Sequence, residues 1–172
     1  MTERIASLDW GATPGADDDR RAAPDAPSAA RTRIERPLRF RPHHFLCSLG
    51  FAGAGYDDNF TVNMEEIVMG LLRAHDGDGV EIEVVAGADA ICAPCPNNLG
   101  PDCTKSAKVN ALDARHAAAL ALVPGERLSW GAAKARIREQ VQPGDLTQLC
   151  AGCEWLELGL CEAALAQLHR KT

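Results

Sequence analysis

Two cysteine clusters with the same spacing limit what this chain can fold into more than any other feature. Both follow the pattern CxxCx7C, and the second starts at position 150, 58 residues after the first at position 92. A CxxC turn places two sulfurs on one side of a tight loop, and the third sulfur returns after a short excursion. We therefore expect each triad to bind metal: the first triad is Cys92, Cys95 and Cys103, and the second triad is Cys150, Cys153 and Cys161.

The metal is expected to be an iron–sulfur cluster, with zinc as the alternative. Soft thiolate ligands select both, so the number of cysteines does not separate them. Zinc knuckles often carry glycine directly after the second cysteine, whereas Pro96 and Glu154 stand at these positions. Zinc would also suit one CxxC pair from each triad, with Cys103 and Cys161 left as structural residues. These four thiolates would come from Cys92, Cys95, Cys150 and Cys153.

Two explanations without metal compete with this one. Cysteine is often a small buried hydrophobe, and Cys161 lies three residues after Leu158 and four before Leu165, on the apolar face of the expected last helix. Disulfides are the other explanation, but the N-terminus carries no apolar run of a secretory signal, and disulfides are uncommon in a reducing compartment. Two matched triads favour metal over either explanation.

The seventh cysteine, Cys47, follows His43 by four residues and His44 by three. On a helix these side chains share a face. Cys47 can complete a four-thiolate cluster with one triad, while His43 or His44 supplies the fourth ligand of the other or supports its ligands. Alternatively, Cys47 is a nucleophile with one histidine as its base, or the group only packs locally. His116, on an apolar helical face, is expected to be a satisfied core histidine.

Composition and charge exclude several classes of protein. The chain has 172 residues, of which 46% are hydrophobic, enough for one domain with a modest core. Its formal net charge of -6 provides no broad positive surface for nucleic acid, and no segment approaches the roughly 20 apolar residues of a membrane span. We expect a cytoplasmic protein in which residues 1–35 are a disordered tail and residues 36–172 form a single cysteine-rich metal-binding domain.

Hydrophobic periodicity predicts several helices and one strand. The strand covers residues 80–85, where branched apolar and acidic residues alternate. Helices are expected to begin at Pro42 and after Ser129, and to cover about residues 60–75, 104–122 and 154–169. The predicted fold class is α+β, a mainly helical small domain with a short strand or small sheet, stabilised by a cysteine-ligated metal centre.

Four ordered motifs together resemble the DUF1284 family of small prokaryotic proteins. They are RPHHFLC, GAGYDDNFTVNM, ICAPCPNN and LCAGCEWLELGLC, and the resemblance spans about residues 36–163. It implies that the two histidines, Cys47 and both CxxC pairs are family positions, and that the chain is an iron–sulfur binder of unknown role, as members are predicted to be. Phe45 and Ala54 depart from the family pattern, in which an aliphatic residue and a lysine are common.

Three functions from different classes follow from these motifs. The first is an iron–sulfur protein that transfers electrons or senses redox state and meets a redox partner protein. The second is a zinc-stabilised interaction module, in which metal substitutes for an insufficient core. The third is a metal- or thiol-dependent enzyme that uses Cys47 with His43 or His44.

Overall fold

A three-stranded sheet organises the computed structural model, which describes residues 36–100 and 102–170. The strand order is β1 (Leu38–Phe40), β2 (Glu81–Val84) and β3 (Arg127–Ser129), with β1 parallel and β3 antiparallel to β2. Within β2, Ile82 and Val84 are buried, which is the alternation that predicted a strand here. The expected tail, residues 1–35, lies outside the described residues.

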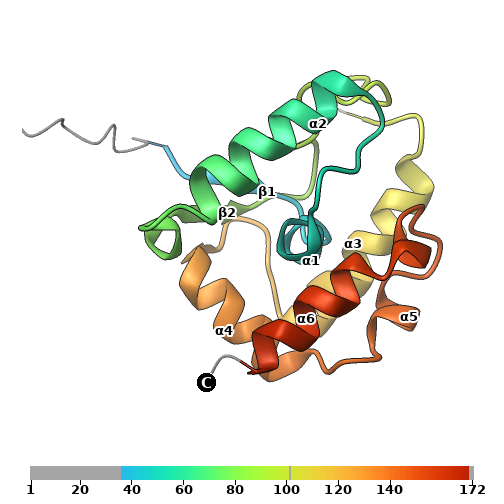
Figure 1. Ribbon diagram of the computed structural model, residues 1–172. Helices are drawn as coiled ribbons and strands as arrows, with labels where there is room; N and C mark the ends of the chain where they lie inside the picture. Colours follow the sequence, from blue (N-terminus) through green and yellow to red (C-terminus); the bar gives the residue numbers. More distant parts are fainter. Residues whose placement is uncertain (1–35, 101, 171–172) are drawn as a thin grey trace, which may run out of the picture. The chain divides into compact units, whose positions relative to one another are not determined.

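Helices make up most of the described chain, which confirms a mainly helical α+β fold (Figure 1). They are α1 (His44–Gly50), α2 (Asp58–Glu65), the π-helix η1 (Glu66–Leu72), the 3-10 helix η2 (Gly77–Gly79), α3 (Ser106–Leu120), α4 (Trp130–Gln140), α5 (Leu146–Leu149), the 3-10 helix η3 (Leu156–Leu158) and α6 (Leu160–Arg170). None of the described helices has both the length and the apolar character that crossing a membrane requires.

The helix expected over residues 60–75 is α2 continued by η1. Asp57 caps it by accepting a hydrogen bond from the Phe60 N–H at 2.8 Å. The helix ends earlier than expected, at Leu72, because its last turn widens and the Arg73 N–H donates to the Val68 carbonyl at 2.9 Å. The Arg73 guanidinium then donates to the Phe51 carbonyl at 2.8 Å, which satisfies a carbonyl just past the end of α1.

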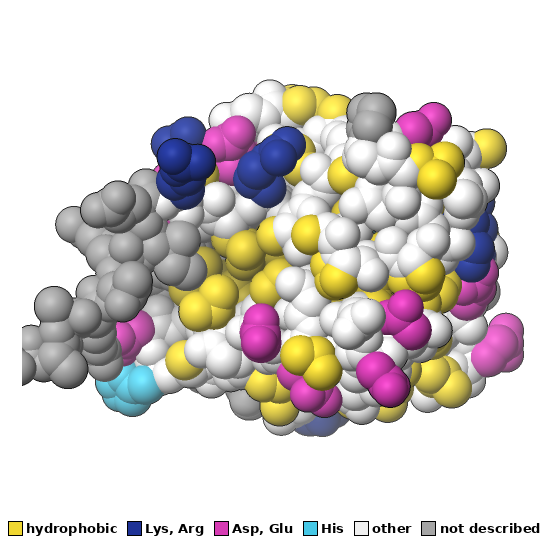
Figure 2. All heavy atoms as spheres, turned by 90° about the horizontal axis from the view of Figure 1, so that it is seen from above, with side chains coloured by type: hydrophobic (Ala, Val, Ile, Leu, Met, Phe, Trp, Pro, Cys, Tyr) yellow, Lys and Arg dark blue, Asp and Glu magenta, His cyan; other side chains and the backbone are white. Residues whose placement is uncertain are grey.

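Figure 2 looks onto the side of the molecule that carries α2 and η1. Hydrophobic side chains lie among acidic ones on this face, and Lys and Arg side chains gather at only a few places. Val62 and Met69 contribute to the hydrophobic surface, being 52% and 53% exposed.

The expected last helix, residues 154–169, is divided in two. Gly159 adopts a left-handed backbone conformation with φ 67°, which ends η3 before α6 begins. Leu158 therefore lies outside α6 and is 54% exposed, so its expected place on one apolar face with Cys161 was wrong. Cys161 lies in the first turn of α6, and Leu165, four residues later, is fully buried.

Helix α1 packs closely against α6 through Gly50. A Cβ atom at Gly50 would lie 2.5 Å from the Cys161 Cα atom and 2.6 Å from its Sγ atom. Real Cβ atoms do not approach other atoms this closely, so glycine is what allows the contact. Since Cys47 is one turn before Gly50 on α1, the same packing carries Cys47 towards Cys161.

Gly50→Ala is expected to lower the free energy of unfolding by about 1–3 kcal/mol, because the added methyl group forces α1 and α6 apart. Gly87→Ala is the matched control, since a Cβ atom at Gly87 meets nothing within 4 Å. Urea unfolding followed by circular dichroism measures both. Equal stability of the two variants would contradict the close contact.

Candidate metal centre

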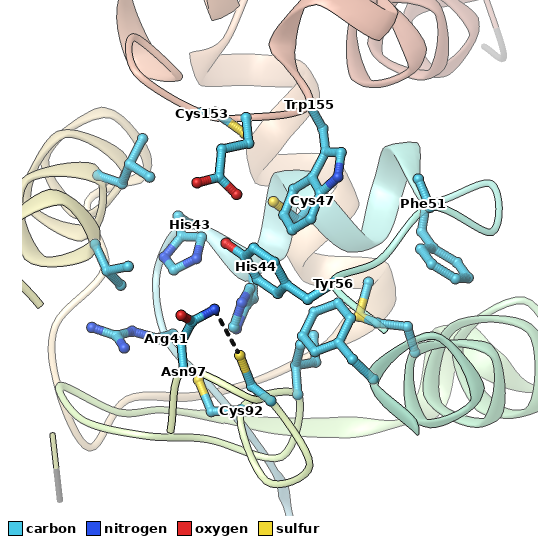
Figure 3. A pocket seen from close by; sticks show the side chains of 18 of the residues that line it. Arg41, His43, His44, Cys47, Phe51, Tyr56, Cys92, Asn97, Cys153 and Trp155 are labelled. Atoms are coloured by element: carbon cyan, nitrogen blue, oxygen red, sulfur yellow. Dashed lines mark hydrogen bonds between the residues drawn. The ribbon is translucent and has the colours of Figure 1, made fainter. Parts of the chain in front are cut away.

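A cavity of about 110 Å³ lies between α1 and the two cysteine-bearing segments, and most of its wall is apolar (Figure 3). His43 and His44 line it together with residues of both cysteine clusters. The cysteines in its wall are Cys47, Cys92, Cys95, Cys103, Cys153 and Cys161. The structure therefore brings six of the seven cysteines and both predicted histidines to one place.

Cys47 and the second triad form one group, which we call the cysteine quartet: Cys47, Cys150, Cys153 and Cys161. Burial, followed by the neighbouring Cys161, Cys153 and Cys150, raises the pKa of Cys47 well above its usual range. Burial and the same kind of neighbours raise the pKa of Cys150 to about 12 and that of Cys161 to about 11. The four thiols therefore influence one another's ionisation, and a positively charged partner among them would favour their thiolate forms.

The second CxxC turn is held from α3. The Cys153 N–H donates to the Cys150 carbonyl at 2.8 Å, and Gly152 takes the left-handed conformation that the turn requires. Arg115 on α3 donates to the Leu149 carbonyl at 2.9 Å and to the Ala151 carbonyl at 2.7 Å. The guanidinium thus fixes the loop on both sides of Cys150.

His116 is a buried core histidine, as predicted, but it also contacts the quartet. Its Nδ1 atom donates to the Leu112 carbonyl at 2.7 Å, and its Nε2 atom lies 3.5 Å from the Cys150 sulfur. Burial lowers the pKa of His116, so the ring is neutral near pH 7. The contact with Cys150 joins residues 34 positions apart, and no local sequence signal indicates it.

The first triad lies on another part of the cavity wall, and N–H groups face its sulfurs. The Lys105 N–H donates to the Cys103 sulfur at 3.4 Å, and the Asn97 side-chain amide lies 3.9 Å from the Cys95 sulfur (Figure 3). The Arg41 guanidinium favours the thiolate of Cys92, although burial outweighs it and raises the pKa of Cys92 to about 12. Hydrogen bonds from N–H groups favour thiolate over thiol, as a metal ligand requires.

Asp89, which sequence reasoning missed, connects the first triad to α1. Its fully buried carboxylate accepts from the His44 Nδ1 atom at 2.6 Å and from the Arg41 N–H at 2.7 Å. It also accepts from the Ile91 N–H at 3.0 Å and the Cys92 N–H at 2.9 Å. Although burial opposes ionisation, His44 and these backbone donors lower the pKa of Asp89 to about 2.

Ligand atoms of His44, Asp89 and Cys92 lie within 4.8 Å of one another, close enough in principle to share a metal ion. Four hydrogen bonds already occupy the roughly four lone-pair positions of a carboxylate, so Asp89 has none left for a metal. Asp89 is therefore a residue that orients His44 and Cys92. Among the described residues, no three cysteine sulfurs lie this close together.

His43 is held by a second buried carboxylate, that of Asp113 on α3. Its Nδ1 atom donates to Asp113 at 2.6 Å, and Arg41 donates to the other Asp113 oxygen at 2.7 Å. Burial and then the neighbouring His44 lower the pKa of His43 to about 4, and together they outweigh Asp113, which raises it. His43 is thus neutral near pH 7.

An aromatic wall and two ion pairs close the remaining side of the cavity. The Tyr56 ring lies 4.7 Å from the Trp155 ring and 5.2 Å from the Phe60 ring, measured between centroids. Glu154, directly after Cys153, accepts from Lys105 at 2.7 Å and from Lys108 at 3.1 Å. These ion pairs link the two cysteine-bearing segments beside the cavity.

The seven cysteines are all free thiols in the structure. Cys150 is buried, being 7% exposed, while the other six cysteines are partly exposed. The zinc arrangement with one CxxC pair from each triad is not preformed, because no three of its four sulfurs lie within 4.8 Å of one another in the described part of the chain.

Asp89→Asn is expected to lower the free energy of unfolding by roughly 3 kcal/mol or more, because an amide cannot accept all four hydrogen bonds and leaves buried donors unpaired. Asp58→Asn, at an exposed position in α2, is the control and changes stability far less. Urea unfolding measures the difference. Similar losses in both variants would show that Asp89 does not anchor the site.

His43 gives stability a specific pH dependence. Its pKa falls from 6.5 to about 4 on folding, so its contribution is complete above pH 6.5 and is lost as the pH falls towards 4. The 2.5-unit difference corresponds to about 3 kcal/mol. His43→Gln removes this part of the slope, whereas His75→Gln, whose side chain is 96% exposed, leaves it. Urea unfolding across this pH window measures both slopes, and an unchanged slope in His43→Gln would contradict the burial of a neutral ring.

The model of a family described as "Protein of unknown function (DUF1284)" matches residues 55–159, more than half of the chain. The match includes both CxxC pairs and Cys103, while His43, His44, Cys47 and Cys161 lie outside it. No curated protein and no solved structure matches the chain. On the evidence of this match and of the four motifs that resemble the family, the chain belongs to the DUF1284 family.

Proposed function

We propose that this protein is an iron–sulfur protein and that the cysteine quartet holds one cluster. The observation that supports this most directly is that α1 brings Cys47 to the second triad through the Gly50 contact with Cys161. Four cysteine thiolates are the usual ligand set of [2Fe–2S] and [4Fe–4S] clusters. The residues present therefore fit such a group in number and in chemistry.

The spacing of the sulfurs favours a cluster over a single zinc ion. Zinc–sulfur bonds of about 2.3 Å in a tetrahedral site place the sulfurs only about 3.8 Å apart. No three sulfurs of the quartet lie within 4.8 Å of one another. A cluster fits wider spacing, because its own iron and sulfide atoms occupy the space between the thiolates.

The surroundings suit electron transfer or redox sensing. A bound cluster supplies one-electron chemistry, and the chain's part is to hold it, exclude water and set its potential. Tyr56, Phe60 and Trp155 shield the cavity, and His116 offers the quartet a polar contact at Cys150. We propose a redox partner protein as the electron donor or acceptor, and the cytoplasm, where thiols stay reduced, as the compartment.

The thiol-enzyme hypothesis has less support. A nucleophilic cysteine requires a lowered pKa and access to substrate, whereas burial and neighbouring sulfurs raise the pKa of Cys47. His43 and His44 each direct one ring nitrogen to a carboxylate, so each ring is oriented as metal-bound histidines commonly are.

Anaerobic purification of the full chain, followed by iron, sulfide and zinc analysis and a visible absorption spectrum, tests the proposal. We expect iron with acid-labile sulfide and a broad charge-transfer band. Cys47→Ser and Cys150→Ser are each expected to reduce the iron of the quartet. Ser48→Ala is the matched control on α1, since the buried Ser48 hydroxyl has no hydrogen-bond partner to lose. Stoichiometric zinc without sulfide would instead favour the zinc-stabilised interaction module, and absence of metal would exclude both.

A further inference from the structure

We propose that the first triad forms a second metal centre and that His44 is its fourth ligand. The ligand set is Cys92, Cys95, Cys103 and the imidazole of His44. This inference rests on the proposed function in one respect only, that Cys47 belongs to the quartet and is therefore not available to the first triad.

The number of cysteines requires a ligand of another kind. Seven cysteines provide four thiolates for the quartet and three for the first triad. Three thiolates leave one position open in a four-ligand site. Asp89, the nearest carboxylate, has its lone pairs occupied by hydrogen bonds. A histidine that lines the same cavity is the remaining candidate.

Of the two histidines, the hydrogen bonds select His44. Asp89 accepts from both the His44 ring and the Cys92 N–H, so one rigid, fully buried carboxylate fixes the histidine and the cysteine together. In Figure 3, Cys92 and Asn97 lie on one side of the pocket, Cys153 and Trp155 lie on the other, and His44 lies between them. Ligand atoms of His44 and Cys92 lie within 4.8 Å of each other. His43 is bonded to Asp113 on α3, and its ring approaches His116 to 6.3 Å between centroids.

The His44 ring is oriented as in many metal sites. Its Nδ1 atom donates to Asp89 at 2.6 Å, which leaves Nε2 as the atom for metal. Metal-bound histidines almost always donate their other N–H to a carboxylate, a carbonyl or water, which fixes the ring and strengthens the ligand. A histidine that only packed in the core would not need a carboxylate that also positions a cysteine.

The donors around the first triad complete the argument. Arg41, the Lys105 N–H and the Asn97 amide each face one of its sulfurs. Such N–H groups stabilise bound thiolates and raise a cluster's reduction potential, and a nitrogen ligand acts in the same direction. Three thiolates and an imidazole suit an iron–sulfur cluster or zinc by their chemistry. The wide spacing of the three sulfurs favours a cluster here as well, and metal analysis distinguishes the two.

The test compares metal content and spectra of the full chain with those of three variants. His44→Ala is expected to lose the metal of the first centre and keep that of the quartet. His44→Cys provides a fourth thiolate, so this variant should regain the metal of the first centre. It should lose the signal of the histidine nitrogen ligand, which pulsed electron paramagnetic resonance detects for a cluster and the visible spectrum detects for a cobalt-substituted zinc site. His75→Ala is the control, since the His75 side chain is 96% exposed and lies outside the cavity wall.

Each outcome has a definite meaning. Loss in His44→Ala, recovery in His44→Cys and no change in His75→Ala support the assignment, and analysis of iron, sulfide and zinc identifies the metal. Unchanged metal and spectra in His44→Ala overturn it, as does loss that His44→Cys does not restore while circular dichroism shows the variant folded. Failure of the proposed function appears differently: the Cys47→Ser variant would contain as much iron as the wild-type chain.

Discussion

The site depends first on the carboxylate of Asp89. Burying a charge without partners is very costly, and Asp89 is tolerated because four N–H groups converge on it. Those donors come from the start of α1 and from the turn that carries the first triad, so a single side chain sets the distance between two segments more than forty residues apart. Arg41, whose backbone bonds Asp89, reaches Asp113 on α3 with its side chain, which extends the same network to a third segment.

Helix α1 contributes residues to both groups of cysteines and histidines around the cavity. Its first turn presents His44 to the Asp89 side, its next turn presents Cys47 to the quartet, and its end meets α6 at Gly50. In a helix, residues three apart differ by about 4.5 Å along the axis, so these groups are held in a fixed relation by one element. The sheet contributes indirectly, since β1 leads into α1 and β2 leads into the Asp89 turn.

The cysteine spacing predicted the two CxxC turns, because such a turn is a local structure, whereas the cavity that six of the seven cysteines line depends on contacts between distant segments. Strand β2 was also predictable from the alternation of buried and exposed residues along it. Helix α2 was predictable from the stripe of buried apolar residues between Phe60 and Leu72. Strands β1 and β3 have three residues each, too few for a period to be recognised. Asp89 and Asp113 were missed because nothing local separates a buried aspartate from the exposed ones, and the side chains that they bond on or beside α1 are 45 to 72 residues away in the sequence. Sequence reasoning left open which triad Cys47 would join, and the proposed quartet is one of the two pairings.

The quartet takes its sulfurs from both ends of the described chain, Cys47 on α1 and Cys161 on α6. During synthesis, α1 leaves the ribosome long before α6 exists, and domains generally fold as units once their chain is available. The fourth corner of the site is therefore absent until the chain has been synthesised through α6. A chain truncated before α6 would leave Cys47 without the helix that packs against α1 at Gly50, so nascent and prematurely terminated molecules expose this thiol more than the folded protein does.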